Sequence, residues 1–327
     1  MSTMRALSAL AIFTAVLAQA PCAGAQDYPT RSATIVVPFA PGGYTDLLAR
    51  LVAQKLSERL GKPFVVENKP GGGTVVAAVA VAKAAPDGYT LMIVPNGTIA
   101  TNPTLYKSLP YNPLKDFVPV ALVASGPLVM LVNPDVPAHS VADLIKLAKE
   151  KPGSLNYGSP TGGANIAVFM NMFQSLAHIK MTEIPYRGVV PMLTDAIAGR
   201  IQVLFADIAS SRGFISEGKL RALGISTQQR FKEMPDIPTI AEAGLPGFNA
   251  AAWQMIVAPA RTPQSVVALL NKDINAIVNA PDIKETIVKY GLIPDGNANP
   301  EELVKFSEAE AARWGEVIKE AGLAGTQ

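Results

Sequence analysis

A buried strand, a tight glycine turn and the start of a helix follow one another in Val36-Val37-Pro38-Phe39-Ala40-Pro41-Gly42-Gly43-Tyr44-Thr45-Asp46. The β-branched run at 35–37 indicates the strand, and leucine and valine at helical spacing over 47–56 indicate the helix. Gly61 follows the last leucine of this pattern, where a glycine commonly ends a helix. The stretch therefore predicts a compact βα unit.

The turn itself offers backbone N–H groups to a ligand. Gly42 and Gly43 allow positive φ and let a ligand approach without meeting a Cβ. Thr45 or Asp46 is expected to cap the helix. Free N–H groups and the positive end of the helix dipole then point to one place, which suits an anion. The alternative is an ordinary βα connection that binds nothing.

A second stretch of the same kind is Leu155-Asn156-Tyr157-Gly158-Ser159-Pro160-Thr161-Gly162-Gly163-Ala164-Asn165. An apolar pattern at helical spacing follows it over 166–176. Two such turns in one chain favour a shared anion site over two ordinary connections.

Strands and helices alternate along most of the chain, which is typical of an α/β fold with ligands at the carboxyl ends of parallel strands. Strands are expected at 34–37, 64–66, 91–94, 117–133, 155–159, 181–185, 203–205, 220–226 and 252–258. Helices are expected at 45–60, 74–85, 140–149, 166–176, 192–198, 262–279 and 300–320. Ser140 with Asp143 forms a capping motif for one helix, and Thr262-Pro263 is expected to cap another.

The domain organisation is expected to be discontinuous. Ser125-Gly126-Pro127 interrupts the long strand and marks a crossing into a second domain, and 235–238 marks the return. One lobe is then 26–124 with 236–327, the other is 125–235, and a two-stranded hinge joins them. Ligand sites favour the cleft between such lobes.

Residues 1–25 have the features of a secretory signal peptide: one early basic residue, an apolar run and Ala23-Gly24-Ala25 as a cleavage site. Cys22 is the only cysteine, and we expect it to be removed with this peptide rather than lipidated. The mature chain then has neither a disulfide nor a thiolate metal site. It carries 27 basic and 26 acidic residues without long blocks of either sign, which argues against nucleic acid or a membrane surface as the main partner.

Several motifs resemble those of the tripartite tricarboxylate transporter substrate-binding proteins, also called Bug receptors. They span nearly the whole mature chain in the family's order: Pro38-Phe39-Ala40-Pro41-Gly42-Gly43, Glu67-Asn68-Lys69-Pro70-Gly71-Gly72-Gly73, Pro86-Asp87-Gly88-Tyr89-Thr90-Leu91, Asn156-Tyr157-Gly158-Ser159, Pro185-Tyr186-Arg187-Gly188 and Gly218-Lys219-Leu220-Arg221-Ala222-Leu223. The resemblance implies an α/β, two-lobed periplasmic binding protein of type II (Venus flytrap), each lobe a mainly parallel sheet flanked by helices.

The resemblance also implies a function and a site. The receptor would capture a small organic carboxylate, with ordered waters in the site and without a cofactor, and deliver it as a monomer to membrane permease subunits. The ligand-binding residues would be Phe39, Ala40, Pro41, Gly42, Gly43, Tyr44, Thr45 and Asp46 in the first lobe, Gly158, Ser159, Pro160, Thr161, Gly162, Gly163, Ala164 and Asn165 in the second, and Asn96, Gly97, Thr98, Arg187, Gly188 and Asp207 around them.

The chain departs from the family pattern close to this site. Tyr44 replaces a small residue, so its ring is expected to fill part of the cleft or to stack on a planar ligand. Ala167 and Asn171 replace the usual histidine and glutamate, and Ala206-Asp207 replaces the usual Asp-Asn. These departures leave the identity of the carboxylate open.

Some site residues have equally simple structural roles. Arg187 either pairs with the ligand or is a solvated residue at the rim. Asp207 either accepts from the ligand or caps the following turn, and capping is favoured. Gly71 to Gly73 is expected to permit close packing of a helix on a strand rather than to bind an anion. His139 and His178 lack metal-ligand spacing and are expected to have ordinary surface or helix-cap roles.

An enzyme is the competing class of protein, and its usual motifs are missing. The sequence has no Gly-x-Ser-x-Gly elbow and no Gly-x-Gly-x-x-Gly. Gly213 to Lys219 has the spacing of a P-loop, but Leu220 replaces the hydroxyl residue that would hold Mg²⁺. A third possibility is a receptor that presents its ligand to a sensor kinase.

Overall fold

The computed structural model describes residues 28–160, 164–186 and 188–327, so the predicted signal peptide at 1–25 lies outside the described residues. The chain divides into two compact units, 1–30 and 31–327, and the second holds all the helices and strands described below.

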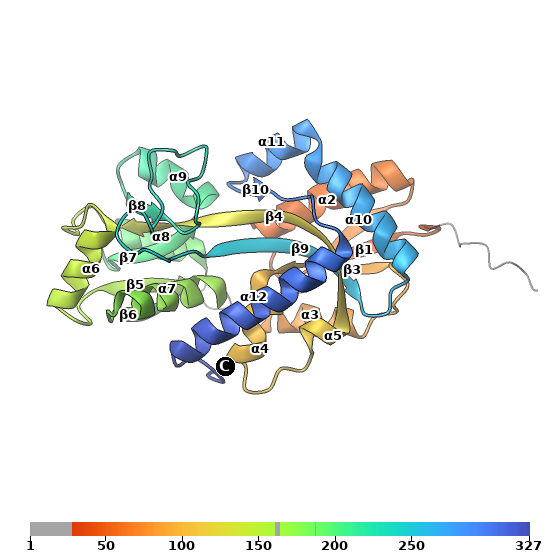
Figure 1. The fold of residues 1–327 in the computed structure, drawn as a ribbon. Coiled ribbons are helices and arrows are strands. Elements are labelled where there is room, and N and C mark those ends of the chain that lie inside the picture. The colour runs from red at the N-terminus through yellow and green to blue at the C-terminus, as the bar shows by residue number, and fades with distance from the viewer. Residues whose placement is uncertain (1–27, 161–163, 187) are drawn as a thin grey trace, which may run out of the picture. The chain divides into compact units, whose positions relative to one another are not determined.

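The strands form one mixed sheet in the order β2-β1-β3-β9-β4-β7-β5-β6, with β8 and β10 also paired to β4 (Figure 1). At the two ends of this order, β2, β1 and β3 pair in parallel, and so do β7, β5 and β6, as expected. The central strands β4 and β9 pair antiparallel to each other and to their neighbours. The strands are β1 (Ala33–Val37), β2 (Phe64–Asn68), β3 (Thr90–Pro95), β4 (Phe117–Val132), β5 (Asn156–Pro160), β6 (Thr182–Tyr186), β7 (Val203–Asp207), β8 (Arg221–Ile225), β9 (Ala251–Pro259) and β10 (Ile293–Pro294).

Strand β4 runs without a break through both halves of the sheet, so the predicted interruption at Ser125–Pro127 is wrong. Its partner changes instead: Pro127 pairs with Ala251 of β9, and Leu128 pairs with Asp207 of β7. Two bulges between Pro119 and Ala124 bend the strand before this point. Proline at 127 lacks an N–H group, yet it is tolerated where a strand exchanges one partner for another.

The chain returns to the first half of the sheet in two steps. After β8, Ile240 donates its N–H to Ile225 O at 2.8 Å and the Ser226 hydroxyl donates to Ala250 O at 2.6 Å, so this segment stays beside β8. Strand β9 then starts at Ala251 and pairs along β4 and β3. Together β4 and β9 make the two-stranded connection that the sequence predicted.

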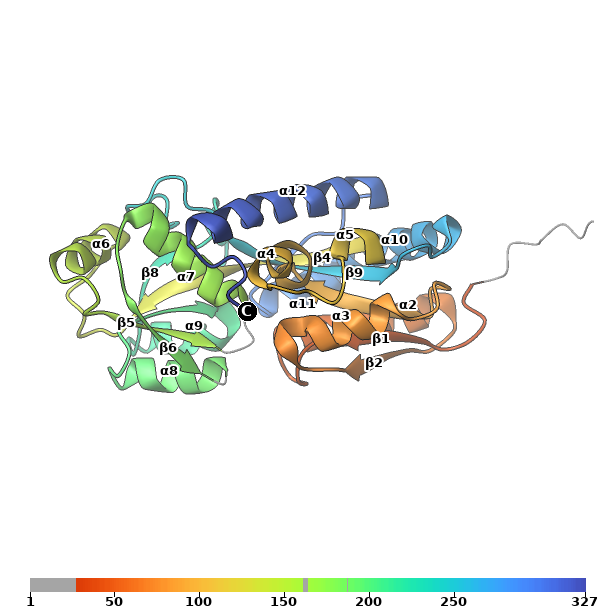
Figure 2. The same cartoon turned by 90° about the horizontal axis from the view of Figure 1, so that it is seen from below.

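Helices cover both faces of the first half of the sheet. On one side of β4 and β9 lie α2 (Tyr44–Leu60), α10 (Gln264–Asn279) and α11 (Pro281–Lys289), and on the other lie α3 (Val75–Ala82), α4 (Asn102–Leu105) and α5 (Pro113–Asp116) (Figure 1). Two short turns of helix, η1 (Gly72–Thr74) and η2 (Gly97–Thr101), follow β2 and β3. The long helix α12 (Pro300–Glu320) runs from α5 past α4 to α7 (Figure 2).

In the second half, α7 (Ala164–Ala177) covers one face of the sheet and α8 (Val189–Ile197) with α9 (Ile208–Ser216) the other. Alternate residues of β4 divide accordingly: Met130 faces the α7 side, and Val129 and Leu131 face α8 and α9. Helix α6 (Val141–Glu150) begins as predicted, with the Ser140 hydroxyl accepting the Asp143 N–H at 3.1 Å.

Four helices of nine residues or fewer were not expected from the sequence: α4, α5, α9 and α11. The predicted cap Thr262 is wrong: Pro263 is the N-cap of α10, and the Thr262 hydroxyl instead donates to Pro259 O at 2.7 Å. No described helix is long and apolar enough to span a membrane.

One apolar core continues from the α3 face of the first half to the α7 face of the second. Phe169 of α7 stacks on Trp314 of α12 with ring centroids 5.1 Å apart and planes 11° apart. Both side chains are fully buried. This stack packs the second half directly against the helix that covers the first.

Candidate functional site

The first glycine turn leads directly into α2. Gly42 has φ +96°, which only glycine adopts easily, and Gly43 is the N-cap with φ −78° and no side-chain cap. The predicted caps, Thr45 and Asp46, are therefore wrong, since both lie inside the helix. The first helical bond joins Leu47 N to Gly43 O at 3.0 Å, so the helix supplies no partner for the N–H groups of its first three residues.

The Asp46 side chain holds the turn in place through hydrogen bonds. Its carboxylate is buried and accepts the Gly42 N–H at 3.0 Å, the Asn68 side-chain N–H at 2.9 Å and two bonds from Arg50 at 2.9 and 3.0 Å. Asn68 also donates to Phe39 O at 2.9 Å. The sequence pattern indicated Asp46 as a ligand contact, but it did not reveal that Arg50 and Asn68 fix the loop through it.

Burial by itself would raise the pKa of Asp46, but the bonds from Arg50, Asn68 and Gly42 lower it below 3.8. The charged form thus stabilises the fold above about pH 4, and this contribution is lost as the pH falls through the lowered pKa. We expect Asp46→Asn to lower the free energy of unfolding by about 1–3 kcal/mol at pH 7. Urea unfolding at pH 7, 5 and 3 should show that the difference in the free energy of unfolding between this variant and wild type narrows only below pH 4. An equal difference at all three pH values would contradict a stabilising role for the charged Asp46 carboxylate.

The segment after β3 lies on a buried polar network. The Thr98 hydroxyl donates to the Thr74 hydroxyl at 2.9 Å, and Tyr111 donates to Thr98 O at 2.8 Å. Asn102 donates to Gly73 O at 3.0 Å and to Tyr111 at 3.1 Å. Burial raises the pKa of Tyr111, so its hydroxyl stays protonated. Of the predicted site residues, this network ties Thr98 to the triple-glycine turn. The neighbouring Asn96 and Gly97 are buried as well.

The triple glycine allows close packing, although its neighbour is the Tyr106 side chain rather than a strand. Gly71, Gly72 and Gly73 all have positive φ, and a Cβ on Gly73 would lie 2.6 Å from the Tyr106 hydroxyl. That hydroxyl donates to Gly72 O at 3.0 Å.

The second turn is described only at its edges. Ser159 is buried on β5, and a Cβ on Gly158 would lie 2.5 Å from Met192, so this glycine lets α8 pack on the strand. Gly188 is half-buried at the start of α8. Thr161, Gly162, Gly163 and Arg187 lie outside the described residues, and Ala164 opens α7. No side-chain placement is described for 160–165.

Asp207 caps a helix, as favoured from the sequence. Its carboxylate accepts the Ser210 N–H and hydroxyl, both at 2.8 Å, at the start of α9.

Tyr44 and Asp207, which come from different halves of the sheet, lie close enough to interact electrostatically. Burial, followed by the nearby Asp207 carboxylate, raises the pKa of Tyr44 to about 12. The phenol at the start of α2 therefore lies within electrostatic reach of the end of β7, although 163 positions separate the two residues in sequence.

At the other positions that depart from the family pattern, the side chains stay within their own helix or strand. Asn171 donates to Ala167 O at 2.9 Å within α7, so it satisfies the helix backbone rather than reaching out of it. Ala206 is fully buried on β7.

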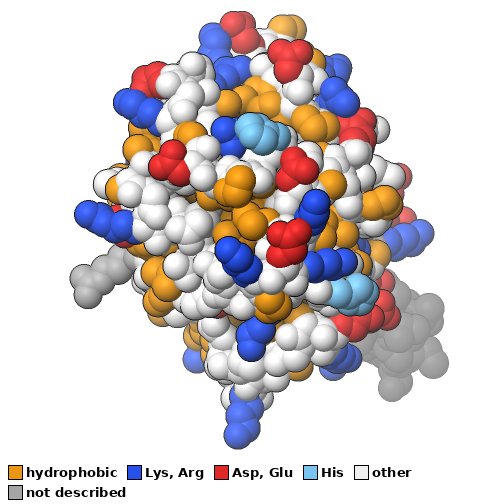
Figure 3. Space-filling view, turned by 90° about the vertical axis from the view of Figure 1, so that its left-hand side faces the viewer, with side chains coloured by type: hydrophobic (Ala, Val, Ile, Leu, Met, Phe, Trp, Pro, Cys, Tyr) orange, Lys and Arg blue, Asp and Glu red, His pale blue; other side chains and the backbone are white. Residues whose placement is uncertain are grey.

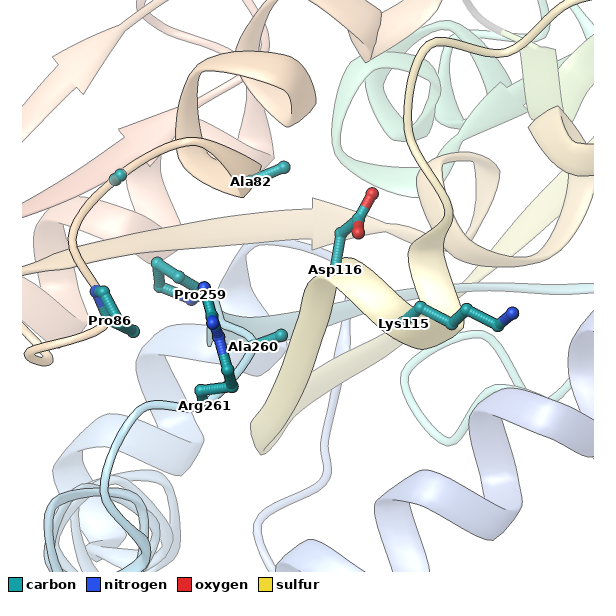
Figure 4. Close-up of a pocket in the computed structure, with 8 residues that line it drawn as sticks. Ala82, Pro86, Lys115, Asp116, Pro259, Ala260 and Arg261 are labelled. Carbon is teal, nitrogen blue, oxygen red and sulfur yellow. The ribbon is translucent and has the colours of Figure 1, made fainter.

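A separate hollow of about 260 Å³ lies at the opposite end of the strands (Figure 4). Lys115, Asp116, Pro259 and Arg261 are among its lining residues. Because β9 is antiparallel to β3, Pro259 lies far from the carboxyl end of β3. The first glycine turn follows the carboxyl end of β1, which is parallel to β3. This hollow shares no residue with the predicted site.

Charged and metal-ligating side chains are spread over the part of the chain that the structure describes. Within the described ranges, no group of three His, Cys, Asp or Glu side chains could hold a metal. His139 and His178 are exposed, as predicted. On the face in Figure 3, basic and acidic side chains are interspersed rather than gathered by sign.

Comparisons with known proteins agree with this architecture. Residues 48–323 match the model of the Tripartite tricarboxylate transporter family receptor. BugT of Bordetella pertussis is 34% identical over 323 residues, 98% of this chain and 99% of BugT. An R. palustris protein solved with adipate is 38% identical with a TM-score of 0.83, covering 91% of this chain and 99% of that one.

MatC from Rhodopseudomonas palustris, solved with bound malate, is 32% identical with a TM-score of 0.79, and the match covers 89% of this chain and 100% of MatC. These relatives are solute-binding receptors with the two-lobed fold of periplasmic binding proteins, not enzymes. The chain accordingly belongs to the tripartite tricarboxylate transporter family of periplasmic solute-binding receptors.

Proposed function

We propose that this receptor binds a small organic carboxylate between the α2 turn and the β5–α7 turn. The convergence of Tyr44 with Asp207 carries the proposal, because it joins the helix start of the first turn to the second half of the sheet. The relatives solved with adipate and malate support an acid as the ligand class.

The chemistry follows from the start of α2. Three N–H groups without helical partners and the positive end of the helix dipole stabilise a carboxylate. The Asp46 network holds the loop in one conformation before the ligand arrives, so little order is lost on binding. The open faces of Gly42 and Gly43, where a Cβ would meet nothing within 4 Å, leave room for the ligand.

We infer that residues 26–124 with 236–327 form one lobe and 125–235 the other, with the stretch up to Ala250 packed on β8. An acid that contacts both lobes favours the closed arrangement by its extra contacts there. Closure excludes water, which strengthens the charge-assisted hydrogen bonds. The receptor is exported by residues 1–25, binds as a monomer with ordered waters in the site, and hands its ligand to the membrane components.

A thermal-shift screen against dicarboxylates, aromatic acids, nicotinate and amino acids tests the proposal. We expect at least one carboxylate to raise the melting temperature in proportion to the logarithm of its concentration above Kd. The same mixtures, analysed by mass spectrometry, should contain unchanged acid. No shift with any acid, or formation of a product, would overturn the proposed function.

A further inference from the structure

Gln254 is a fully buried polar side chain for which the protein supplies no partner. It lies on β9 with an exposed fraction of 0%. Among the described residues, neither its amide nitrogen nor its amide oxygen finds a hydrogen-bond partner. Burying an unpaired amide costs stability, and such groups in a folded protein require an explanation.

The neighbours across the sheet cannot satisfy this amide. The registers place Pro294, Ala124, Gln254 and Pro95 in one row across β10, β4, β9 and β3. Side chains in such a row point to the same face. None of the three neighbours has a polar side-chain atom.

The neighbours along β9 cannot satisfy it either. Residues two positions away on a strand share its face, and here they are Ala252 and Ile256. A hydrogen-bond partner for the Gln254 amide must therefore come from outside the sheet, on the face to which this side chain points.

The face is the one that carries the first glycine turn. Trp253 and Met255 point to the other face, into the core shared with α3 and α12. Gln254 therefore points to the side of α2. The turn follows the end of β1, and in the sheet order β1 lies two strands from β9, with β3 between them. Two strand spacings amount to about 10 Å.

We propose that Gln254 is a specificity-determining residue, whose amide binds the end of the ligand remote from its anchored carboxylate. An amide needs one acceptor and one donor opposite it. A carboxamide or a hydroxyl supplies both, whereas a methyl group supplies neither. A buried polar group of this kind discriminates strongly, because an analogue without the matching group leaves it unpaired. The inference rests on the proposed carboxylate function.

Matched acids of equal length test this assignment. Calorimetry compares each ω-amide with the alkanoate of the same number of carbons: succinamate with butyrate, glutaramate with pentanoate, and adipamate with hexanoate. At the length that reaches Gln254, wild type should bind the ω-amide at least about tenfold more tightly than the alkanoate. Gln254→Leu should remove this preference, and Gln254→Asn, shorter by one methylene, should move it to the acid one carbon longer.

Gln254→Met serves as a second apolar variant of nearly the same length. In both apolar variants the melting temperature without ligand should equal or exceed that of wild type, because an unpaired buried amide is removed. A lower melting temperature with an unchanged amide preference would assign Gln254 to the fold instead and overturn the inference. Equal binding of amide and alkanoate by wild type would overturn it as well. Failure of wild type to bind any carboxylate in the broader screen would instead refute the proposed function.

Discussion

Gly43→Val is expected to abolish the rise in melting temperature that a bound carboxylate gives, while leaving the melting temperature without ligand nearly unchanged. Gly43 has φ −78°, which valine adopts without strain, and a Cβ there meets nothing within 4 Å. The branched side chain would, however, stand over the N–H groups at the start of α2. Losing two such charge-assisted bonds costs about 3–6 kcal/mol, or at least a hundredfold in Kd.

Gly213→Val is the matched control. It makes the same substitution in α9, also where a Cβ meets nothing within 4 Å, and at a position outside the predicted site. It should keep the full ligand response in the same thermal-shift assay. If Gly43→Val kept that response too, the backbone of the first turn would not be the anchor for the carboxylate.

Phe169→Ala should be among the most destabilising single substitutions in this protein. The side chain is fully buried and stacks on Trp314 at 5.1 Å, so its removal leaves a cavity between α7 and α12. Truncating a buried phenylalanine typically costs about 3–5 kcal/mol. Urea unfolding followed by circular dichroism should show a midpoint lowered accordingly, with loss of the tryptophan signal that reports the stack.

Leu176→Ala in the same helix is the control, because this leucine is exposed. Its free energy of unfolding should change by no more than about 0.5 kcal/mol. Equal effects of the two substitutions would mean that the stack is not a principal contact between α7 and α12.

Local patterns predicted much of the fold. The β-branched run before Gly42 is β1, the leucine spacing after it is α2, and Gly61 ends that helix in the left-handed conformation. Ser140 caps α6 as its motif indicated. These features depend on residues a few positions apart, which is why they could be recognised without coordinates.

Helix caps and strand ends were less predictable where two local solutions compete. Asp46 has the right side chain for a cap, but as the third helical residue it instead accepts the Gly42 N–H and an Arg50 pair. Ser125–Pro127 looks like a break, yet β4 continues because β9 pairs with it through this point. In both places, partners far from the motif selected one solution.

The amino-acid sequence by itself determined the order of βα units, the two glycine turns and the motifs of the family. These features depend on side-chain periodicity, backbone freedom at glycine and short-range capping, all of which act between residues close together in the chain. The meeting of Tyr44 with Asp207, the row of apolar residues around Gln254 and the Phe169–Trp314 stack exist only in the folded chain. Each of them joins residues that lie far apart in the sequence. The row around Gln254 depends on the registers of β10, β4, β9 and β3, and strand register is set by packing over the whole sheet rather than by any one segment.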